Sequence, residues 1–134
     1  MKKYVSNRVF RIWMYSVSHS TLIIRSEMKI DDYEGKPVSS NSTINSNIDI
    51  EFCNVSYLEI PTDFEGISIS IKEDNITGFN KYLIHDSSVV FEIVSNNANY
   101  FVVAGGCIIG QNKWINQNRI LNPTLDYDEV THFF

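Results

Sequence analysis

The sequence has little alanine, and this shortage bears directly on its secondary structure. Only two of its 134 residues are alanine, whereas eighteen are isoleucine, fifteen serine and fourteen asparagine. Alanine is the strongest helix former and isoleucine fits a pleated sheet, so the composition predicts that helix is scarce. The chain is long enough to bury a core without a disulfide or a metal, and we expect one domain over residues 1–134.

Long apolar runs and cysteine clusters are also missing. No run approaches the roughly 18 apolar residues that cross a bilayer, and the first ten residues lack the apolar core of a signal peptide. We therefore expect a cytoplasmic protein with no membrane partner. Cys53 and Cys107 are too few and too far apart for a zinc motif. We expect small buried thiols there, and no cofactor.

Positive charge is scarce outside the first 29 residues. Residues 1–29 contain six basic residues and one acid, a balance of +5, whereas the other 105 contain five basic and fifteen acidic residues, a balance of −10. Phosphate backbones are bound mainly through lysine and arginine, so this balance argues against a nucleic-acid partner. It favours a basic protein as partner, although acids that only keep a domain soluble would give the same balance.

The residues that are abundant form a succession of strand-like runs, organised around the stretch from Arg8 to Ser26. This stretch contains two runs rich in β-branched and aromatic residues, Val9–Val17 and Thr21–Arg25, and it predicts a central antiparallel hairpin. Further strands are predicted at 47–52, 55–60, 67–71, 88–95, 100–104 and 107–109, with a hairpin turn at 96–99. The segments 79–84 and 114–121 fit a helix or a strand, and 30–47 reads as a long exposed loop.

Eight or nine strands without crossover helices or an internal repeat predict an all-β fold. The architecture is expected to be a single-domain antiparallel β-sandwich, or a flattened β-barrel or roll. We expect the core to include Trp13, Ile24, Ile50, Leu58, Ile69, Phe91 and Val102.

Three histidines are the natural candidates for catalysis, and none lies in a catalytic motif. His19 is flanked by serines, but neighbouring side chains of an extended segment point to opposite faces, so we expect a turn residue rather than part of a nucleophile pair. His85, with Asp86 and Glu92, resembles the metal-binding strands of small β-barrels but lacks their paired His-x-His. His132 lies near the chain end, where fraying is expected. We predict no catalytic residue and no metal ligand.

Three classes of function stay open. The segregated charge and the lack of catalytic motifs favour a protein that acts by binding another protein. One alternative is a β-barrel that binds a small ligand in a cavity lined by some of the seven tyrosines and two tryptophans. The other is a metal-dependent, cupin-like enzyme that uses His85. The runs 67–71 and 89–94 would be adhesive at a sheet edge, so a homodimer is also expected.

Acidic side chains beside aromatic ones suit a protein-binding surface, because the charges steer a partner and the rings anchor it. We expect such a surface to combine the loop 31–34, the polar face of the strand 47–52 and the C-terminal tail. The predicted contacts are Asp31, Asp32, Tyr33, Glu34, Asp49, Glu51, Asp126, Tyr127, Asp128 and Phe134. Tyr33, Tyr127 and Phe134 would be the anchors.

The stretch RVFRIWMYSVSHSTLIIRS, taken with the size, acidity and strand pattern of the chain, resembles the small acidic all-β proteins of bacterial toxin-immunity families and their uncharacterised neighbours. The resemblance contains no motif that identifies functional residues. It implies that an acidic face of the protein neutralises a basic toxin, such as a nuclease.

Overall fold

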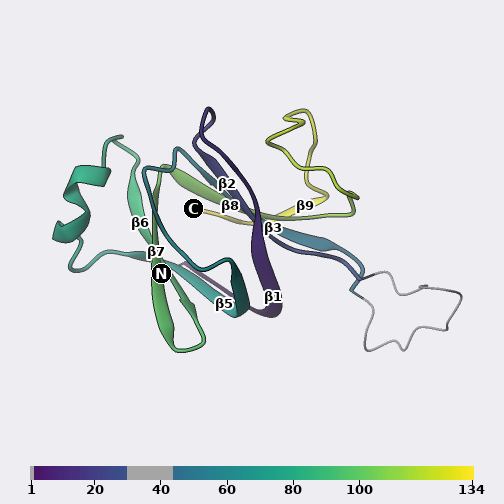
Figure 1. The fold of residues 1–134 in the computed structure, drawn as a ribbon, viewed down its shortest axis with the longest axis horizontal. Coiled ribbons are helices and arrows are strands. Elements are labelled where there is room, and N and C mark those ends of the chain that lie inside the picture. Colours follow the sequence, from purple (N-terminus) through teal and green to yellow (C-terminus); the bar gives the residue numbers. More distant parts are fainter. Residues whose placement is uncertain (1, 30–43) are drawn as a thin grey trace, which may run out of the picture.

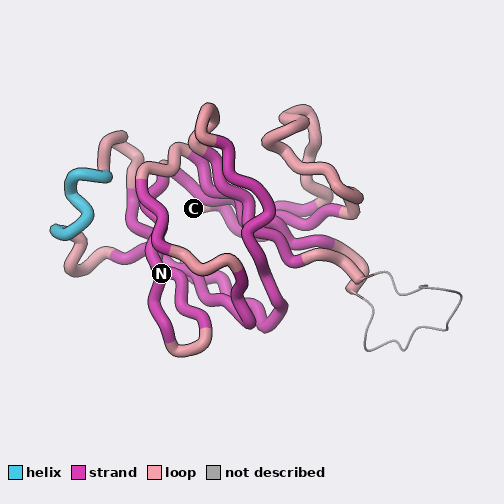
Figure 2. Tube along the Cα trace, in the orientation of Figure 1, coloured by secondary structure: helices cyan, strands magenta, loops and turns pink. Residues whose placement is uncertain are grey.

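The computed structural model describes residues 2–29 and 44–134, whose strands form one antiparallel sheet (Figures 1 and 2). The strands of these residues are β1 (Lys3–Ser16), β2 (Thr21–Ser26), β3 (Asn47–Cys53), β4 (Tyr57–Glu59), β5 (Asp63–Lys72), β6 (Val89–Ser95), β7 (Ala98–Ala104), β8 (Gly106–Asn112) and β9 (Glu129–Phe133), with one short 3-10 helix, η2 (Thr77–Tyr82). Their order in the sheet is β4-β7-β6-β5-β1-β2-β3-β8-β9. The prediction of an all-β, antiparallel fold with eight or nine strands is confirmed.

The predicted hairpin of β1 and β2 is confirmed, and β1 is the middle strand of the sheet. β1 begins at Lys3, earlier than predicted, and its register shifts twice: between Ser6 and Val9 against β5, and between Ile12 and Met14 against β2. Bulges of this kind bend a strand and increase its twist. Such bulges are therefore expected in the middle strand of a sheet that curves around its own core.

The rolled sheet brings strands that are far apart in its order together around one core. Phe52 of β3 lies against Phe91 of β6, with 5.2 Å between ring centroids, and Phe91 also lies 5.9 Å from the ring of Phe134. Five predicted core residues are fully buried: Ile24, Ile50, Ile69, Phe91 and Val102. β4 and β9 stand at opposite ends of the order and do not pair with each other in the described ranges, so the sheet is not closed.

The prediction that Trp13 lies in the core is wrong. Its ring is only partly buried on the outer face, the face opposite the core, with its centroid 4.6 Å from the guanidinium carbon of Arg25. Both faces of the run 9–17 are largely apolar, so alternation alone did not decide which face turns inward. Leu58 is partly buried and packs against the core from the edge strand β4.

The hairpin predicted around residues 96–99 joins β6 and β7. Ser95 pairs with Ala98, which leaves a two-residue turn of Asn96 and Asn97. Both asparagines have positive φ, 51° and 61°, as a type I′ turn requires, and asparagine tolerates this conformation better than most residues.

The C-terminal tail is a strand, and the fraying expected at His132 is wrong. β9 pairs with β8, and just beyond it the backbone of Phe134 exchanges two hydrogen bonds with Cys107, at 2.8 and 3.3 Å. The ring of His132 meets that of Tyr4 edge-on at 5.0 Å, and Phe134 packs against the core. The end of the chain is therefore part of the folded body.

The two ambiguous segments and the cysteines are also placed. Residues 77–82 form η2, and residues 113–128 form an irregular connection with turns. Of the predicted loop 30–47, residues 30–43 lie outside the described residues, and Ile44 forms an isolated bridge with Lys29. Cys107 is buried in the core and Cys53 is partly buried, both as free thiols.

No helix of residues 2–29 and 44–134 is long and apolar enough to span a membrane. The runs that suggested a homodimer lie inside the sheet, 67–71 in β5 and 89–94 in β6. The edge strands have protective features: β4 is three residues long, and β9 has a register shift and an exposed Glu129. Short, bulged and charged edges discourage sheet-to-sheet pairing. The reason for expecting a homodimer therefore no longer holds.

The two C-terminal phenylalanines provide a matched test of the rolled sheet. Phe134→Ala removes a ring that packs on the core and should lower the free energy of unfolding by about 2 kcal/mol, less than for a fully buried ring. Phe133 is 64% exposed, and Phe133→Ala should change stability by no more than about 0.5 kcal/mol. Urea denaturation measures both variants, and equal effects would contradict the docking of Phe134.

Candidate functional site

The outer face of the sheet is polar along β2, β3 and β8, where the sequence predicted an exposed acidic strand. Arg25 lies directly opposite Asp49 in the register, on the face away from the core. The connection between β8 and β9, residues 113–128, covers these side chains and is called the β8–β9 segment below. Whether these groups are available to a partner depends on this cover.

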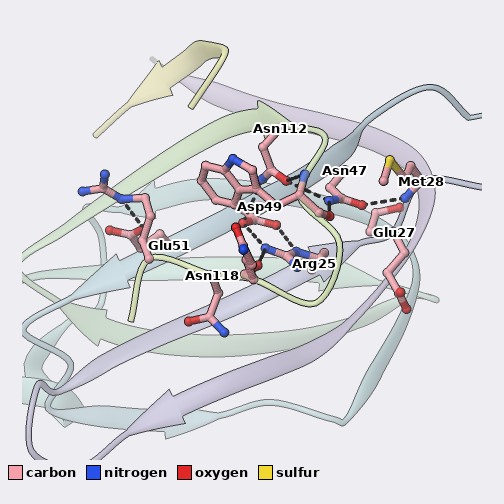
Figure 3. A network of polar contacts seen from close by, with 12 residues as sticks. Arg25, Glu27, Met28, Asn47, Asp49, Glu51, Asn112 and Asn118 are labelled. Carbon is pink, nitrogen blue, oxygen red and sulfur yellow. Dashed lines mark hydrogen bonds and ion pairs between the residues drawn. The ribbon is translucent and has the colours of Figure 1, made fainter. Parts of the chain in front are cut away.

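Arg25 and Asp49 form a buried ion pair, with side chains only 1% and 0% exposed. Nε of Arg25 donates to Oδ1 of Asp49 at 2.5 Å, and Nη2 donates to Oδ2 at 2.8 Å and to the carbonyl oxygen of Gln117 at 2.7 Å. Asn112 donates a further bond to Asp49 Oδ2 at 3.1 Å, and the groups lie side by side in Figure 3. The carboxylate and the guanidinium are thus engaged by each other and by the β8–β9 segment.

Two asparagines extend this network toward the end of β2. Nδ2 of Asn47 donates to Asn112 Oδ1 at 2.7 Å and to the carbonyl of Trp114 at 2.8 Å, and its Oδ1 accepts from the backbone of Met28 at 2.8 Å (Figure 3). In the described part of the chain, no buried side-chain nitrogen or oxygen lacks a hydrogen-bond partner. Because the buried groups of this network already have hydrogen-bond partners, we interpret the network as stabilising the fold and not as a ligand site.

Glu51 holds the far end of the β8–β9 segment. It accepts hydrogen bonds from Arg119 Nε at 3.1 Å and from the hydroxyl of Tyr127 at 2.8 Å. The ring of Tyr127 stacks on Trp114 at 5.2 Å and lies directly over Gly110, where a Cβ would come within 2.5 Å of the ring. Burial and the nearby negative charge of Glu51 raise the pKa of Tyr127 well above its usual range.

The six predicted contact residues that the structure describes do not form one exposed surface. The expectation that Asp49 faces solvent is wrong because it is paired with Arg25, and Glu51 is largely covered. Tyr127 and Phe134 are packed against the protein itself rather than free to anchor a partner. Asp126 and Asp128 are exposed as predicted. The remaining four, Asp31, Asp32, Tyr33 and Glu34, lie outside the described residues.

The sequence did contain a signal for the buried pair. Arg25 ends the apolar run Thr21–Arg25, and a charged residue in a buried strand requires a partner of opposite charge. Asp49 occupies the corresponding position in the alternating strand 47–52, but only the register of β2 with β3 identifies it.

His19 is closer to its serine neighbours than predicted. Residues 17–20 form a turn, so Oγ of Ser16 and of Ser18 come within 2.9 and 3.2 Å of His19 Nδ1. The argument that an extended chain keeps them apart was therefore wrong. These groups are exposed, and among the described residues no carboxylate bonds the imidazole. Residues 2–29 and 44–134 contain no group of three His, Cys, Asp or Glu side chains that could hold a metal ion.

Sequence reasoning missed an aromatic cluster at the β4 end of the sheet. The ring of Tyr57 lies 4.6 Å from that of Tyr82 and 5.6 Å from that of Phe79, which in turn lies 5.2 Å from Phe101. The four rings are half-buried, on strands β4 and β7 and on η2, which stands at the left in Figure 1. Beneath them, Val103 is fully buried on the same face as Tyr57.

Charged residues, more of them acidic than basic, lie beside these rings or flank η2 in the chain. The acids are Glu59, Glu73, Asp74 and Asp86, all exposed, and Glu92, which is partly buried; the bases are Lys72 and Lys81. The hydroxyl of Tyr57 donates to Glu59 at 2.6 Å, while Lys81 Nζ lies 5.1 Å from the ring centroid of Tyr82. We call these four rings and seven charged residues the η2 surface. It has the combination of acids and rings that we expected at the C-terminal tail.

Comparisons with protein-family models, with curated proteins and with solved structures found no match for this chain. The geometry of the described residues is therefore the basis of the functional assignment.

The buried ion pair predicts that two aspartates, one buried and one exposed, contribute very differently to stability. Asp49→Asn leaves the charge of Arg25 buried without a counter-ion, so we expect it to lower the free energy of unfolding by roughly 3–5 kcal/mol. Asp128→Asn makes the same change at an exposed position and should stay within about 0.5 kcal/mol of the original protein. Urea denaturation at neutral pH compares them, and a loss below about 1 kcal/mol for Asp49→Asn would contradict this role.

The raised pKa of Tyr127 predicts a loss of stability at alkaline pH. Below the usual tyrosine pKa of 10.0 the phenol is neutral in both states, and above it only the unfolded chain ionises, so the contribution of Tyr127 falls as pH rises. From pH 9 to pH 11 this loss should be about 1.4 kcal/mol. Other groups with raised pKa values remain in the Tyr127→Phe variant, so its stability also falls between pH 9 and pH 11. Urea denaturation at both pH values should show that the free energy of unfolding falls by about 1.4 kcal/mol less in the variant than in the original protein. Parallel falls would show that the phenol ionises freely.

Proposed function

We propose that the protein acts by binding a basic partner protein and that the η2 surface makes the contact. The observation that carries this proposal is the group of four half-buried rings with Glu59 bonded to Tyr57, Glu92 opposite Phe101 in the register, and three further exposed acids in the segments that flank η2. Carboxylates of this density attract a basic partner from a distance, and aromatic side chains supply most of the contact energy once the surfaces meet. Because the rings already pack on one another, binding would order few new side chains.

The surface accepts positive charge within its own chain, which supports a basic partner. Lys72 Nζ lies 3.8 Å from Glu92 and 5.9 Å from the centroid of Phe101, and Lys81 lies over Tyr82. Cations are attracted both to carboxylates and to the faces of aromatic rings. An arginine or lysine of the partner would use the same attraction.

Neutralisation of a basic toxin is the specific role we propose, as the resemblance to immunity proteins suggests. Such inhibition requires only that an acidic surface cover the basic substrate channel of the toxin, and it needs no catalytic residue on the inhibitor. Asp126 and Asp128, exposed near Val130 and Phe133, form a second acidic region that serves as the internal control for this assignment.

The test compares two charge reversals that change net charge equally. One variant replaces Glu59, Glu73, Asp74 and Asp86 with lysine, and the control replaces Glu65, Asp126, Asp128 and Glu129, all exposed. The partner is first recovered from source cells by cross-linking to the original protein. Its affinity for each variant is then measured by calorimetry with purified components at low and high salt.

We expect the η2 variant to bind at least 100-fold more weakly at low salt and the control to lose less than 10-fold. High salt should reduce the difference, because it screens exposed charges. A larger loss in the control would move the contact to the C-terminal region. Recovery of an acidic partner, or affinities that do not depend on salt, would overturn the proposal of a basic partner.

A further inference from the structure

A cavity lies along the β1–β2 hairpin, and none of the residues that line it belongs to the η2 surface. It is open, has a volume of about 600 Å³ and is lined by Arg8, Val9 and Arg11 from β1. Glu27, Lys29 and Ile44 also line it, as does the exposed Asp63 from β5. Cavities of roughly 300–1,000 Å³ are typical of small-molecule sites. The nature of its lining decides which ligand it fits.

Arg8 brings to this cavity a charge that no carboxylate of the described residues balances. Its Nε donates to Oγ of Ser26 at 2.9 Å, and its Nη2 donates to the carbonyl oxygens of Ser26 at 2.9 Å and Ser46 at 2.8 Å. Its Nη1 makes no hydrogen bond to a described residue. Arg8 lies within the register shift of β1 between Ser6 and Val9. Partial burial lowers its pKa, as is expected for a cation withdrawn from water without a counter-ion.

The other charged groups leave one positive charge in excess. Arg11 pairs with Glu27, and Arg25, which also lines the cavity, is neutralised by Asp49. Lys29 is exposed and makes no ion pair within the described ranges, which leaves Arg8 and Lys29 against Asp63. A ligand with a single negative charge matches this balance. A dianion such as a phosphate monoester would meet repulsion from Asp63 and Glu27.

The cavity also has an apolar part. Val9 is 61% exposed, and Ile44, which lines the same cavity, is partly buried. No aromatic ring is exposed in the lining, since the one aromatic residue there, Phe10, is fully buried in the core. The site therefore offers no platform for stacking a nucleobase or a sugar. It offers a hydrocarbon surface next to a cation.

We propose that this cavity binds a carboxylate attached to an apolar body. The carboxylate would lie between Nη1 of Arg8 and Nζ of Lys29, and the apolar body would cover Val9 and Ile44. Two ligands share this chemistry, a fatty acid and the C-terminal residue of a peptide. Charge-assisted hydrogen bonds to guanidinium and ammonium groups are among the strongest that proteins make.

The first experiment measures binding of three probes with the same eight-carbon chain, by calorimetry and by the shift in Tm. Octanoate should bind and raise Tm, whereas octanol and octylamine should not, because they lack the negative charge. A parallel pair, N-acetyl-Ala-Ala-Val and its C-terminal amide, distinguishes the sources: binding of the free acid alone assigns a peptide terminus, and binding of octanoate alone assigns a fatty acid. If neither carboxylate binds, or if octanol binds as well as octanoate, the proposal is wrong.

Variants then locate the site with matched charge changes. Lys29→Glu alters an exposed side chain and should weaken binding of whichever carboxylate probe binds by at least tenfold, while Lys113→Glu, an equal change at another exposed lysine, should leave it within twofold. Asp63→Asn removes the opposing carboxylate and should strengthen binding about threefold. Equal losses in the two lysine variants would show a general charge effect and overturn the site. None of these residues belongs to the η2 surface, so this result is independent of the proposed protein partner.

Discussion

The buried pair of Arg25 and Asp49 is the interaction on which the outer half of this structure depends. Two charges taken out of water cost several kcal/mol each unless every bonding group finds a partner. β2 and β3 supply the charges, β8 supplies Asn112, and the β8–β9 segment supplies a carbonyl. Slipping the β2–β3 register by one residue would put the two charges on opposite faces of the sheet and leave one of them without its partner, so the pair also fixes how these two strands align.

This constraint determines which charges remain for function. Asp49 and Glu51, the acids that alternation placed on an exposed strand face, hold the β8–β9 segment in place and are withdrawn from solvent. Exposed acids are found instead on the opposite half of the sheet, with Glu59 beside Tyr57 on β4 and three others in the segments that flank η2. The proposed partner is therefore the same in character as the sequence suggested, but its contact surface is different.

The excess of positive charge in the first 29 residues has a structural explanation as well. Arg25 neutralises Asp49, Arg11 pairs with Glu27, and Arg8 binds the backbone at the ends of β2 and β3. Lys2 donates to the carbonyl oxygen of Phe133 at 2.6 Å, which links the start of the chain to its last strand. Most of these basic side chains therefore link strands through hydrogen bonds and ion pairs. The proposed ligand would bind the charge that remains in the cavity beside Arg8.

The sequence by itself determined the all-β class, the central hairpin and interior positions such as Ile24 and Phe91, because β-branched composition and alternation act over a few neighbouring residues. Tertiary structure alone decided that Trp13 lies outside the core, that Asp49 is buried against Arg25, and that the tail forms β9. It also gathered Tyr57, Phe79 and Phe101, from three separate segments, into the η2 surface. Each of these outcomes depends on which distant strands pair and on which face of the sheet turns inward. The local sequence pattern specifies neither the pairing nor the inward face, because a strand with two apolar faces fits either orientation.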